Sequence, residues 1–407
     1  MKEISGGVCA PKGFSAGGIR CGIKESSQKK DLALIYSKKQ CSAAGKFTKN
    51  NVRAACVDVS QSNVFCGHLH AIIANSGNAN ACTGQEGLLA AQRMAQLAAD
   101  ALQFDPREAA VASTGVIGVP FPIAKIEGSI GALKAGLRSD EQGHSDALEA
   151  IMTTDTRKKE IALEFEIDGK PVRMGAMAKG SGMIHPNMAT MLCFITTDAD
   201  IIPSALDAAL QRAVKRSFNR LSVDGDTSTN DMVIVMANGE AGIQSITAYS
   251  AGYDIFRAAL EKVCICLARM MARDGEGATK LVTVTVTGAA VEKTAEALAK
   301  SVVSSNLVKA ACFGADANWG RVLCAMGNAG VEFSPEKTNL IFKSAAGEIE
   351  VCKNGESVPF SEEKAKTILR EEEIEILINL HDGEEKASAW GCDLTYDYVK
   401  INGDYRS

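Results

Sequence analysis

Apolar positions along this chain recur at two spacings, and together they predict an alternation of strands and helices. Short apolar runs predict buried strands at residues 31–37 and 71–75, and helical spacing within GLLAAQRMAQLAADAL predicts a helix ending near Leu102. Further helices are expected at 121–137 and 144–152. The first 30 residues are dominated by glycine and small side chains, so we expect an irregular lead-in that docks on the body of the protein.

The middle of the chain carries a hairpin pattern. Leu163, Phe165 and Ile167 alternate with polar residues, DG follows as a turn, and the returning strand ends at Lys179. Later elements are expected as a strand to about Thr197, helices at 203–218, 253–273, 291–311 and 361–370, a half-exposed Val and Thr strand at 280–288, and strands at 338–343, 347–352, 374–380 and 392–401. Both types alternate without an internal repeat, so the fold class is α/β, and the hairpin implies mixed sheets.

Composition narrows the functional classes. Hydrophobic residues make up 46% of the 407 residues, enough for a sizeable core, and the net charge of -5 gives no drive toward nucleic acid or an anionic membrane. No apolar stretch has the length of a signal-peptide core or a membrane span, so the cytoplasm is the expected compartment. The 13 cysteines contain no CxxC pair and the 5 histidines no i, i+4 pair, so neither a disulfide framework nor a metal site is expected.

The stretch KGSGMIHPNMATML, residues 179–192, looks like a place where the chain cuts itself. Gly, Pro and Asn favour a bend that leads directly into Thr190, whose hydroxyl could attack the carbonyl carbon of Ala189. The cut would give fragments 1–189 and 190–407, which together form one intertwined catalytic unit. Thr190 would then carry an α-amine beside its own hydroxyl, a nucleophile with a built-in base. The alternative is that Thr190 is only a turn residue.

Other candidate residues have structural alternatives that the sequence leaves open. Thr114 and Gly115, at the end of the apolar run EAAVASTGV, are either a strand end or an oxyanion pocket, because glycine allows close backbone approach. Asn75–Gly84, NSGNANACTG, is either a tight turn or a set of backbone donors around a ligand. Glu276 is isolated between two glycines and is otherwise an ordinary loop acid. Asp224–Asp231 resembles a calcium loop in composition, but a hydrogen-bonded turn fits better because the closing glutamate is missing.

Nine motifs in order closely resemble the ornithine acetyltransferase family of arginine biosynthesis, also called bifunctional glutamate N-acetyltransferase and amino-acid acetyltransferase. They cover nearly the whole chain: GVCAPKGF at 7–14, NSGNANACTG at 75–84, STGVIG at 113–118, MTTDT at 152–156, KGSGMIHPNMATML at 179–192, SVDGDTSTND at 222–231, RDGEGATKL at 273–281, GADANWGRV at 314–322 and YVKINGDYRS at 398–407. The resemblance implies self-cleavage between Ala189 and Thr190, mixed sheets sandwiched with helices, and two copies of each fragment.

The resemblance also implies residue roles. Thr190 corresponds to the nucleophile that accepts acetyl, and Thr114 with Gly115 to the oxyanion donors. The substrate contacts that it implies are Thr153, Lys179, Thr190, Glu276, Asn402 and Ser407. This sequence departs from the family pattern at His185, where a small residue is familiar, and at Ser407, where threonine is common.

The chemistry that these residues suit is acetyl transfer between two amines. Thr190 can form an ester, and an α-amine with a reference pKa of about 8 suits it as a base. The expected reaction is ping-pong transfer from N2-acetylornithine to glutamate, with no resident cofactor and with acetyl-coenzyme A as a second donor to be tested. The alternatives are a self-processing amidohydrolase or aminopeptidase with the same kind of nucleophile, and an uncleaved amino-acid-binding module.

Overall fold

The structure is a computed structural model of the full chain, and it describes residues 1–25, 27–185 and 191–403. The chain divides into two compact units. The first contains the described residues of 1–180, 186–219 and 227–267, and the second those of 181–185, 220–226 and 268–407. Each unit therefore combines residues from both sides of the predicted cut.

The first unit is built on a mixed sheet that contains nine strands of the described chain, in the order β1-β6-β7-β8-β10-β3-β4-β5, with β2 paired to β3. Pairs β8/β10 and β4/β5 are parallel and the others antiparallel. The strands are β1 (Lys2–Ile4), β2 (Phe14–Ile19), β3 (Leu32–Phe47), β4 (His68–Asn78), β5 (Ala109–Val116), β6 (Lys159–Ile167), β7 (Lys170–Lys179), β8 (Leu192–Thr197) and β10 (Met232–Ala237).

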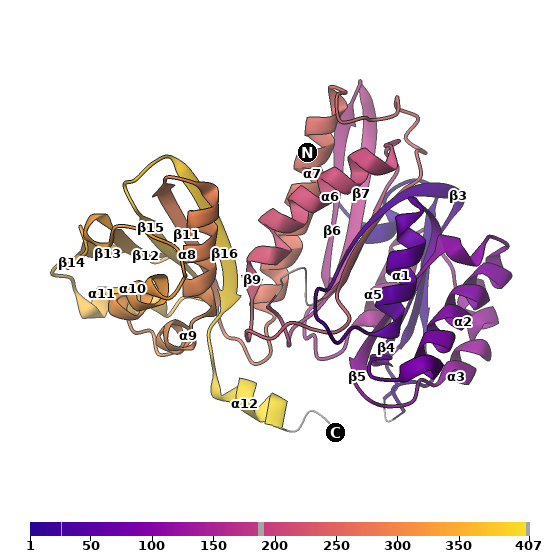
Figure 1. Ribbon diagram of the computed structural model, residues 1–407, viewed down its shortest axis with the longest axis horizontal. Coiled ribbons are helices and arrows are strands. Elements are labelled where there is room, and N and C mark those ends of the chain that lie inside the picture. Colours follow the sequence, from indigo (N-terminus) through magenta and orange to yellow (C-terminus); the bar gives the residue numbers. More distant parts are fainter. Residues whose placement is uncertain (26, 186–190, 404–407) are drawn as a thin grey trace. The chain divides into compact units, whose positions relative to one another are not determined.

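Helices pack against this sheet, and Figure 1 shows α1 and α2 beside β4 and β5. The helices that begin in the first unit are α1 (Ala55–Phe65), α2 (Gly84–Leu102), α3 (Ile123–Glu127), α4 (Ile130–Ala135), α5 (Glu141–Ile151), α6 (Pro203–Arg216) and α7 (Gly252–Arg273), with short 3-10 turns η1 (Gly7–Cys9), η2 (Pro106–Glu108) and η3 (Phe218–Arg220). The buried core between sheet and helices is rich in alanine, which lets helices approach the strands closely.

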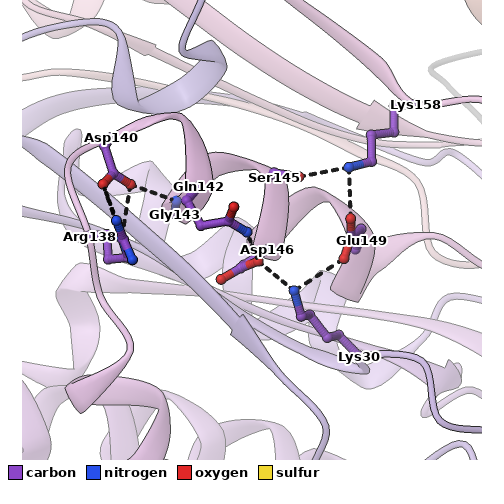
Figure 2. Close-up of polar contacts among 9 residues, drawn as sticks. All are labelled: Lys30, Arg138, Asp140, Gln142, Gly143, Ser145, Asp146, Glu149 and Lys158. Carbon is purple, nitrogen blue, oxygen red and sulfur yellow. Dashed lines mark hydrogen bonds and ion pairs between the residues drawn. The ribbon is translucent and has the colours of Figure 1, made fainter.

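Helix α5 is anchored by partly exposed ion pairs (Figure 2). Lys30 Nζ lies 2.5 Å from Asp146 and 3.1 Å from Glu149, and Lys158 Nζ lies 2.7 Å from Glu149. At the start of the helix, the side chain of Asp140 accepts a hydrogen bond from a backbone amide of the first turn. These contacts fix the segments before and after α5, which include part of the candidate site described below.

The second unit is built on another mixed sheet, with the strand order β14-β13-β12-β15-β11-β16-β9 among the described residues. Its strands are β9 (Leu221–Ser222), β11 (Leu281–Ala289), β12 (Asn339–Ser344), β13 (Gly347–Lys353), β14 (Glu356–Ser357), β15 (Glu373–Asn379) and β16 (Glu385–Cys392). Its helices are α8 (Glu292–Ser304), α9 (Asn306–Phe313), α10 (Trp319–Gly327), α11 (Glu362–Leu369) and α12 (Tyr396–Gly403), with the 3-10 turn η4 (Pro335–Lys337). The valines of β11 face a core that α8 and α11 complete.

The mixed α/β fold with helices packed on sheets is confirmed, and so is the hairpin of β6 and β7. Asp168 and Gly169 have φ values of 52° and 72°, the left-handed conformation of a tight two-residue hairpin turn. The predicted helices at 121–137 and 291–311 are each divided in two. Gly128 ends the first half of one, and Ser305 caps the second half of the other by accepting from a backbone amide.

Two expectations about the fold are wrong, and one helix was not predicted. The lead-in is not irregular throughout, because β1 pairs with β6 and β2 with β3. Helix α1 was not expected. The predicted strand at 392–401 is helix α12 instead, because Thr395 accepts a hydrogen bond from the amide of Tyr398 and so caps a helix. On that helix Tyr396 and Val399 are solvent-accessible.

Candidate active site

The predicted site residues fall into three groups. Ala189, Thr190 and Ser407 lie outside the described residues. Thr114, Gly115, Thr153 and Lys179 belong to the first unit, whereas Glu276 and Asn402 belong to the second. The described candidates are therefore divided between the two units.

Thr114 and Gly115 lie at the end of β5, where it pairs with the end of β4. Gly115 has a φ of 132° and Gly77 opposite it has a φ of 100°, conformations that favour glycine. A Cβ added to Gly115 would lie 2.4 Å from the carbonyl carbon of Gly77. The two backbones therefore approach as closely as glycine alone permits. The ladder is also irregular between Gly77 and Asn78, so the strand end is a shaped turn rather than a plain terminus.

The asparagine-rich stretch that begins at the end of β4 bonds to its own backbone and to that of α2. The side-chain amide of Asn75 donates to the carbonyl oxygen of Asn78 at 2.9 Å, and that of Asn80 to the carbonyl oxygen of Gly87 at 2.9 Å. Both asparagines are buried. This favours the turn interpretation of NSGNANACTG over a set of donors directed at a ligand. Its function is to brace the edge of the sheet that carries Thr114.

Asn230, which is distant in the sequence, also binds the backbone near the ends of β4 and β5. Its side-chain amide donates to the carbonyl oxygens of Ala79 at 2.6 Å and Ser113 at 2.8 Å. It lies in the polar stretch that resembles a calcium loop, and the buried amide explains why polar residues gather there. Among the residues that the structure describes, no cluster of three or more His, Cys, Asp or Glu side chains could hold a metal.

Lys179 ends β7 and brings a cation to the turn at Thr114 and Gly115. Its Nζ lies 3.3 Å from Thr114 Oγ1, and the residue is 9% exposed. A hydroxyl oxygen that accepts from an ammonium group keeps its own hydrogen to donate. Thr114 is therefore placed to offer a polarised O–H group, and the structure brings together two residues that the sequence separates by three helices and a hairpin.

Asp155, which the sequence analysis did not single out, is a buried carboxylate beside the candidate residues. Its carboxylate accepts from Lys159 Nζ at 2.7 Å, from the amide of Gly180 at 2.7 Å and from the amide of Thr153 at 3.0 Å. Burial acts to raise the pKa of Asp155, but the charges of Lys179 and Lys159 and the hydrogen bonds lower it overall. One buried carboxylate thus ties the Thr153 turn to the end of β7.

Asp155→Asn is expected to lower the free energy of unfolding by about 3–5 kcal/mol, because it breaks a buried ion pair whose side chains are both 0% exposed. Since the folded-state pKa is lowered, the stabilisation is present at neutral pH and is lost only as the pH falls below the ordinary carboxyl range. Urea unfolding at neutral and acidic pH measures both effects. Glu149→Gln is the matched control: its side chain is 41% exposed, so a loss within about 1 kcal/mol is expected. Equal losses would refute the role given to Asp155.

Lys24, in the lead-in, is a second residue that sequence reasoning missed. Its Nζ donates to the carbonyl oxygens of Met152 at 2.7 Å and Lys30 at 3.1 Å. Burial lowers the pKa of Lys24 to about 8; the charge of Asp31 opposes this effect, and the charge of Lys179 adds to it. The backbone around it is held by Asp31, a buried carboxylate that accepts from three backbone amides of residues 21–24. The lead-in therefore contacts the residue directly before Thr153.

In the second unit, the structure brings Glu276 and Asn402 together as the resemblance implies. The side-chain amide of Asn402 donates to Glu276 Oε2 at 2.9 Å, and Glu276 is 7% exposed. The neighbouring Gly277 lies against the first turn of α12, where a Cβ would come within 2.6 Å of the Tyr398 amide nitrogen. Glu276 is therefore a buried carboxylate with a side-chain amide partner, and the interpretation as an ordinary loop acid is wrong.

His185 is held by hydrogen bonding. Its Nδ1 lies 3.0 Å from Ser222 Oγ. Burial and the charge of Lys300 lower the pKa of His185 to about 4, so its imidazole is neutral at pH values near 7. The departure from the family pattern at this position therefore adds a larger side chain but no positive charge near neutral pH.

The comparisons with known proteins decide the family. The sequence model of the ArgJ family matches residues 15–407. The chain belongs to the ArgJ family. The arginine biosynthesis bifunctional protein ArgJ of Symbiobacterium thermophilum is 53% identical over 408 residues, which is 100% of both proteins. The protein of the same name from Caldanaerobacter subterraneus is 49% identical over 407 residues, again 100% of both.

A solved member of the ArgJ family agrees in structure. The arginine biosynthesis bifunctional protein argJ from Bacillus halodurans is 48% identical, with a TM-score of 0.50, and the match covers 52% of this chain and 97% of that chain. The family resemblance found in the motifs is confirmed. Among the described residues, none of the helices combines the length and the hydrophobicity needed to cross a lipid bilayer.

Proposed function

We propose that this ArgJ-family chain cuts itself between Ala189 and Thr190 and then carries acetyl from N2-acetylornithine to glutamate as an ester of Thr190. The observation that carries the proposal is the arrangement of Lys179 Nζ 3.3 Å from the hydroxyl of Thr114, beside the glycine turn at Gly115. Such an arrangement suits an oxyanion pocket, which acetyl transfer requires. The relatives' names place them in arginine biosynthesis, which supports these substrates.

The cleavage step needs only the chain and water. Thr190 Oγ attacks the Ala189 carbonyl carbon, the peptide C–N bond breaks, and the hydroxyl proton passes to the departing nitrogen. Water then hydrolyses the ester, which leaves a carboxylate on Ala189 and restores the hydroxyl of Thr190 beside a new α-amine. That amine is the base for the second reaction.

The length of the solved relative supports a divided chain. The match to the Bacillus halodurans protein covers nearly all of the solved chain but only 52% of this one, so that chain is little more than half as long. Residues 190–407 are a similar share of this sequence. A chain of that length is expected for one fragment of a protein that has been cut once.

Acetyl transfer repeats the same chemistry on a substrate. Thr190 Oγ attacks the acetyl carbon of N2-acetylornithine, and the negative charge on the tetrahedral oxygen is met by donors at Thr114 and Gly115. The C–N bond breaks, ornithine leaves with the proton on its α-amine, and the acetyl ester remains. The amine of glutamate then attacks the ester and the threonine hydroxyl is regenerated.

The substrate contacts follow from charge. Lys179 can pair with the substrate's α-carboxylate and Glu276 with the side-chain amine of ornithine, while Thr153, Asn402 and Ser407 contribute polar contacts.

We further propose two copies of each fragment in the assembly. The cytoplasm is the proposed compartment, in keeping with 13 cysteines that form no disulfide in the part of the chain that the structure describes.

Ornithine release from N2-acetylornithine is expected to depend on glutamate, because the acetyl ester must be discharged before a second turnover. The assay measures ornithine with and without glutamate, and product acetylglutamate by mass spectrometry. One turnover per site without glutamate and sustained turnover with it is the expected result. Sustained release without glutamate would instead favour the amidohydrolase.

The same assay tests the second donor. The relatives are named bifunctional, and we propose acetyl-coenzyme A as the donor of a second activity. Replacing N2-acetylornithine with acetyl-coenzyme A should then still yield acetylglutamate. No product with this donor would limit the enzyme to transfer from N2-acetylornithine.

A further inference from the structure

Residues 181–185 form a short arm that belongs to the second unit although it precedes the proposed cut. The amide of Glu276 donates to the carbonyl oxygen of Ser181 at 2.8 Å, and this fixes the start of the arm. The arm ends one residue before Pro186. The arm is therefore the last described segment before the proposed cut.

A single carboxylate binds the middle of the arm. Asp224 accepts from the backbone amide of Met183 at 2.5 Å and from that of Ile184 at 2.8 Å. The carbonyl oxygen of Ile184 in turn accepts from the amide of Val223 at 2.6 Å. Hydrogen bonds from backbone amides to a carboxylate are among the stronger ones in proteins. We call Val223 and Asp224 with the two arm residues that they hold the Asp224 clamp.

Tyr398 of α12 lies close enough to the clamp to feel its charge. Burial, together with the nearby charges of Asp224 and Glu276, raises the pKa of Tyr398. The hydroxyl therefore remains protonated and can donate to the carboxylate. The amide of Asp226 adds a bond of 3.2 Å to the same carboxylate.

The clamp holds a conformation that the arm would not readily adopt alone. Met183 has a φ of 55°, in the left-handed region that residues other than glycine rarely occupy. Its side chain is 43% exposed, so packing in the core does not explain the conformation. Backbone strain that is maintained by specific bonds is characteristic of sites where geometry serves a reaction.

We propose that Asp224 is a positioning residue for the self-cleavage, which it promotes by holding Met183 and Ile184 in this strained turn. The inference rests on the proposed function, since it presupposes the cut after Ala189. Intramolecular attack depends steeply on the approach of the hydroxyl to the carbonyl carbon, and a small misplacement of the reacting groups costs about 10²-fold in rate. Without the clamp, we expect the hydroxyl and the carbonyl carbon to meet in many geometries, most of which do not lead to cleavage.

The chain offers a matched control in Asp393. This buried carboxylate of the second unit also accepts from two consecutive backbone amides, those of Thr279 at 2.9 Å and Lys280 at 3.0 Å, but it does not bind the arm. Asp224→Asn and Asp393→Asn therefore each remove a carboxylate that accepts from two consecutive backbone amides of the second unit. A purely structural role predicts the same effect on cleavage from both.

The experiment is cell-free synthesis of the full chain, with the two fragments followed over time on denaturing gels. Asp224→Asn is expected to slow cleavage at least tenfold, whereas Asp393→Asn stays within threefold of the wild type. Melting temperatures of both variants, measured in an uncut Thr190→Ala background, report folding separately. If Asp224→Asn does not fold, Asp224→Glu replaces it, and cleavage at least threefold slower than wild type is expected because the carboxylate is displaced by one methylene.

The outcomes separate the two proposals. Equal slowing by Asp224→Asn and Asp393→Asn, or a wild-type rate in the tested Asp224 variant, would overturn the positioning role while leaving self-cleavage intact. A wild-type chain that is never cut would overturn the proposed function itself, and the positioning role with it.

Discussion

A Thr190→Ala chain is expected to remain a single polypeptide of 42.9 kDa and to transfer no acetyl group. Without the hydroxyl, no group at this position can attack the carbonyl carbon of Ala189, so no α-amine is released and no ester can form. A denaturing gel with N-terminal sequencing measures the first effect, and ornithine release from N2-acetylornithine measures the second.

The control for this substitution is Thr190→Ser, which keeps a hydroxyl at the same position. It should still give two fragments, the larger beginning with the substituted residue, and it should retain acetyl transfer at a reduced rate. Two fragments from Thr190→Ala would place the nucleophile elsewhere.

Thr114→Val is expected to reduce kcat by roughly 10²–10³-fold, equivalent to about 2.7–4 kcal/mol of barrier, because one oxyanion donor is lost. Valine has nearly the shape of threonine, so the strand end and its approach to Gly77 should survive. The measurement is steady-state transfer by cleaved protein, with cleavage checked on the same preparation.

Thr114→Ser serves as its partner variant, since it retains the hydroxyl that lies 3.3 Å from Lys179 Nζ in the wild type. It should keep most of the activity. If Thr114→Val were as active as Thr114→Ser, the hydroxyl would have no part in stabilising the oxyanion, and only backbone donors of the turn would remain for that role.

Local sequence patterns predicted much of the fold. The alternation in 161–167 and the DG turn predicted the hairpin, and β8, α6, α7 and α11 lie close to their expected positions. Errors arose where one hydrogen bond decides between two patterns. Residues 392–401 were predicted as a strand, but the cap from Thr395 begins a helix there, and Ser305 divides what was predicted as one helix.

The motifs identified candidate site residues, but they did not identify the buried residues that hold the surrounding backbone in place. Motifs identified Thr114 and Lys179, and the structure brings them together. Asp155 and Lys24 could not be found in this way, because their roles depend on burial and on backbone groups far away in the sequence. A lone acid among threonines and a lysine in a glycine-rich lead-in carry no spacing signal.

Asp224 shows the same limit. Composition placed it in a polar turn, which is right, but the amides that it binds come from the arm before the proposed cut, about forty residues earlier in the chain. Only tertiary structure shows that the turn and the arm meet. Long-range contacts of this kind are set by topology rather than by local propensity.

The central claim is that Thr190 is released by a cut and then carries acetyl. Intact-mass and peptide mass spectrometry of the purified protein, incubated with N2-acetylornithine in the absence of glutamate, tests it most directly. The account predicts a fragment that begins at Thr190 and gains the mass of one acetyl group on its N-terminal peptide, and loss of that group when glutamate is added. An uncut chain, or a Thr190 fragment that never gains the acetyl group, would contradict it.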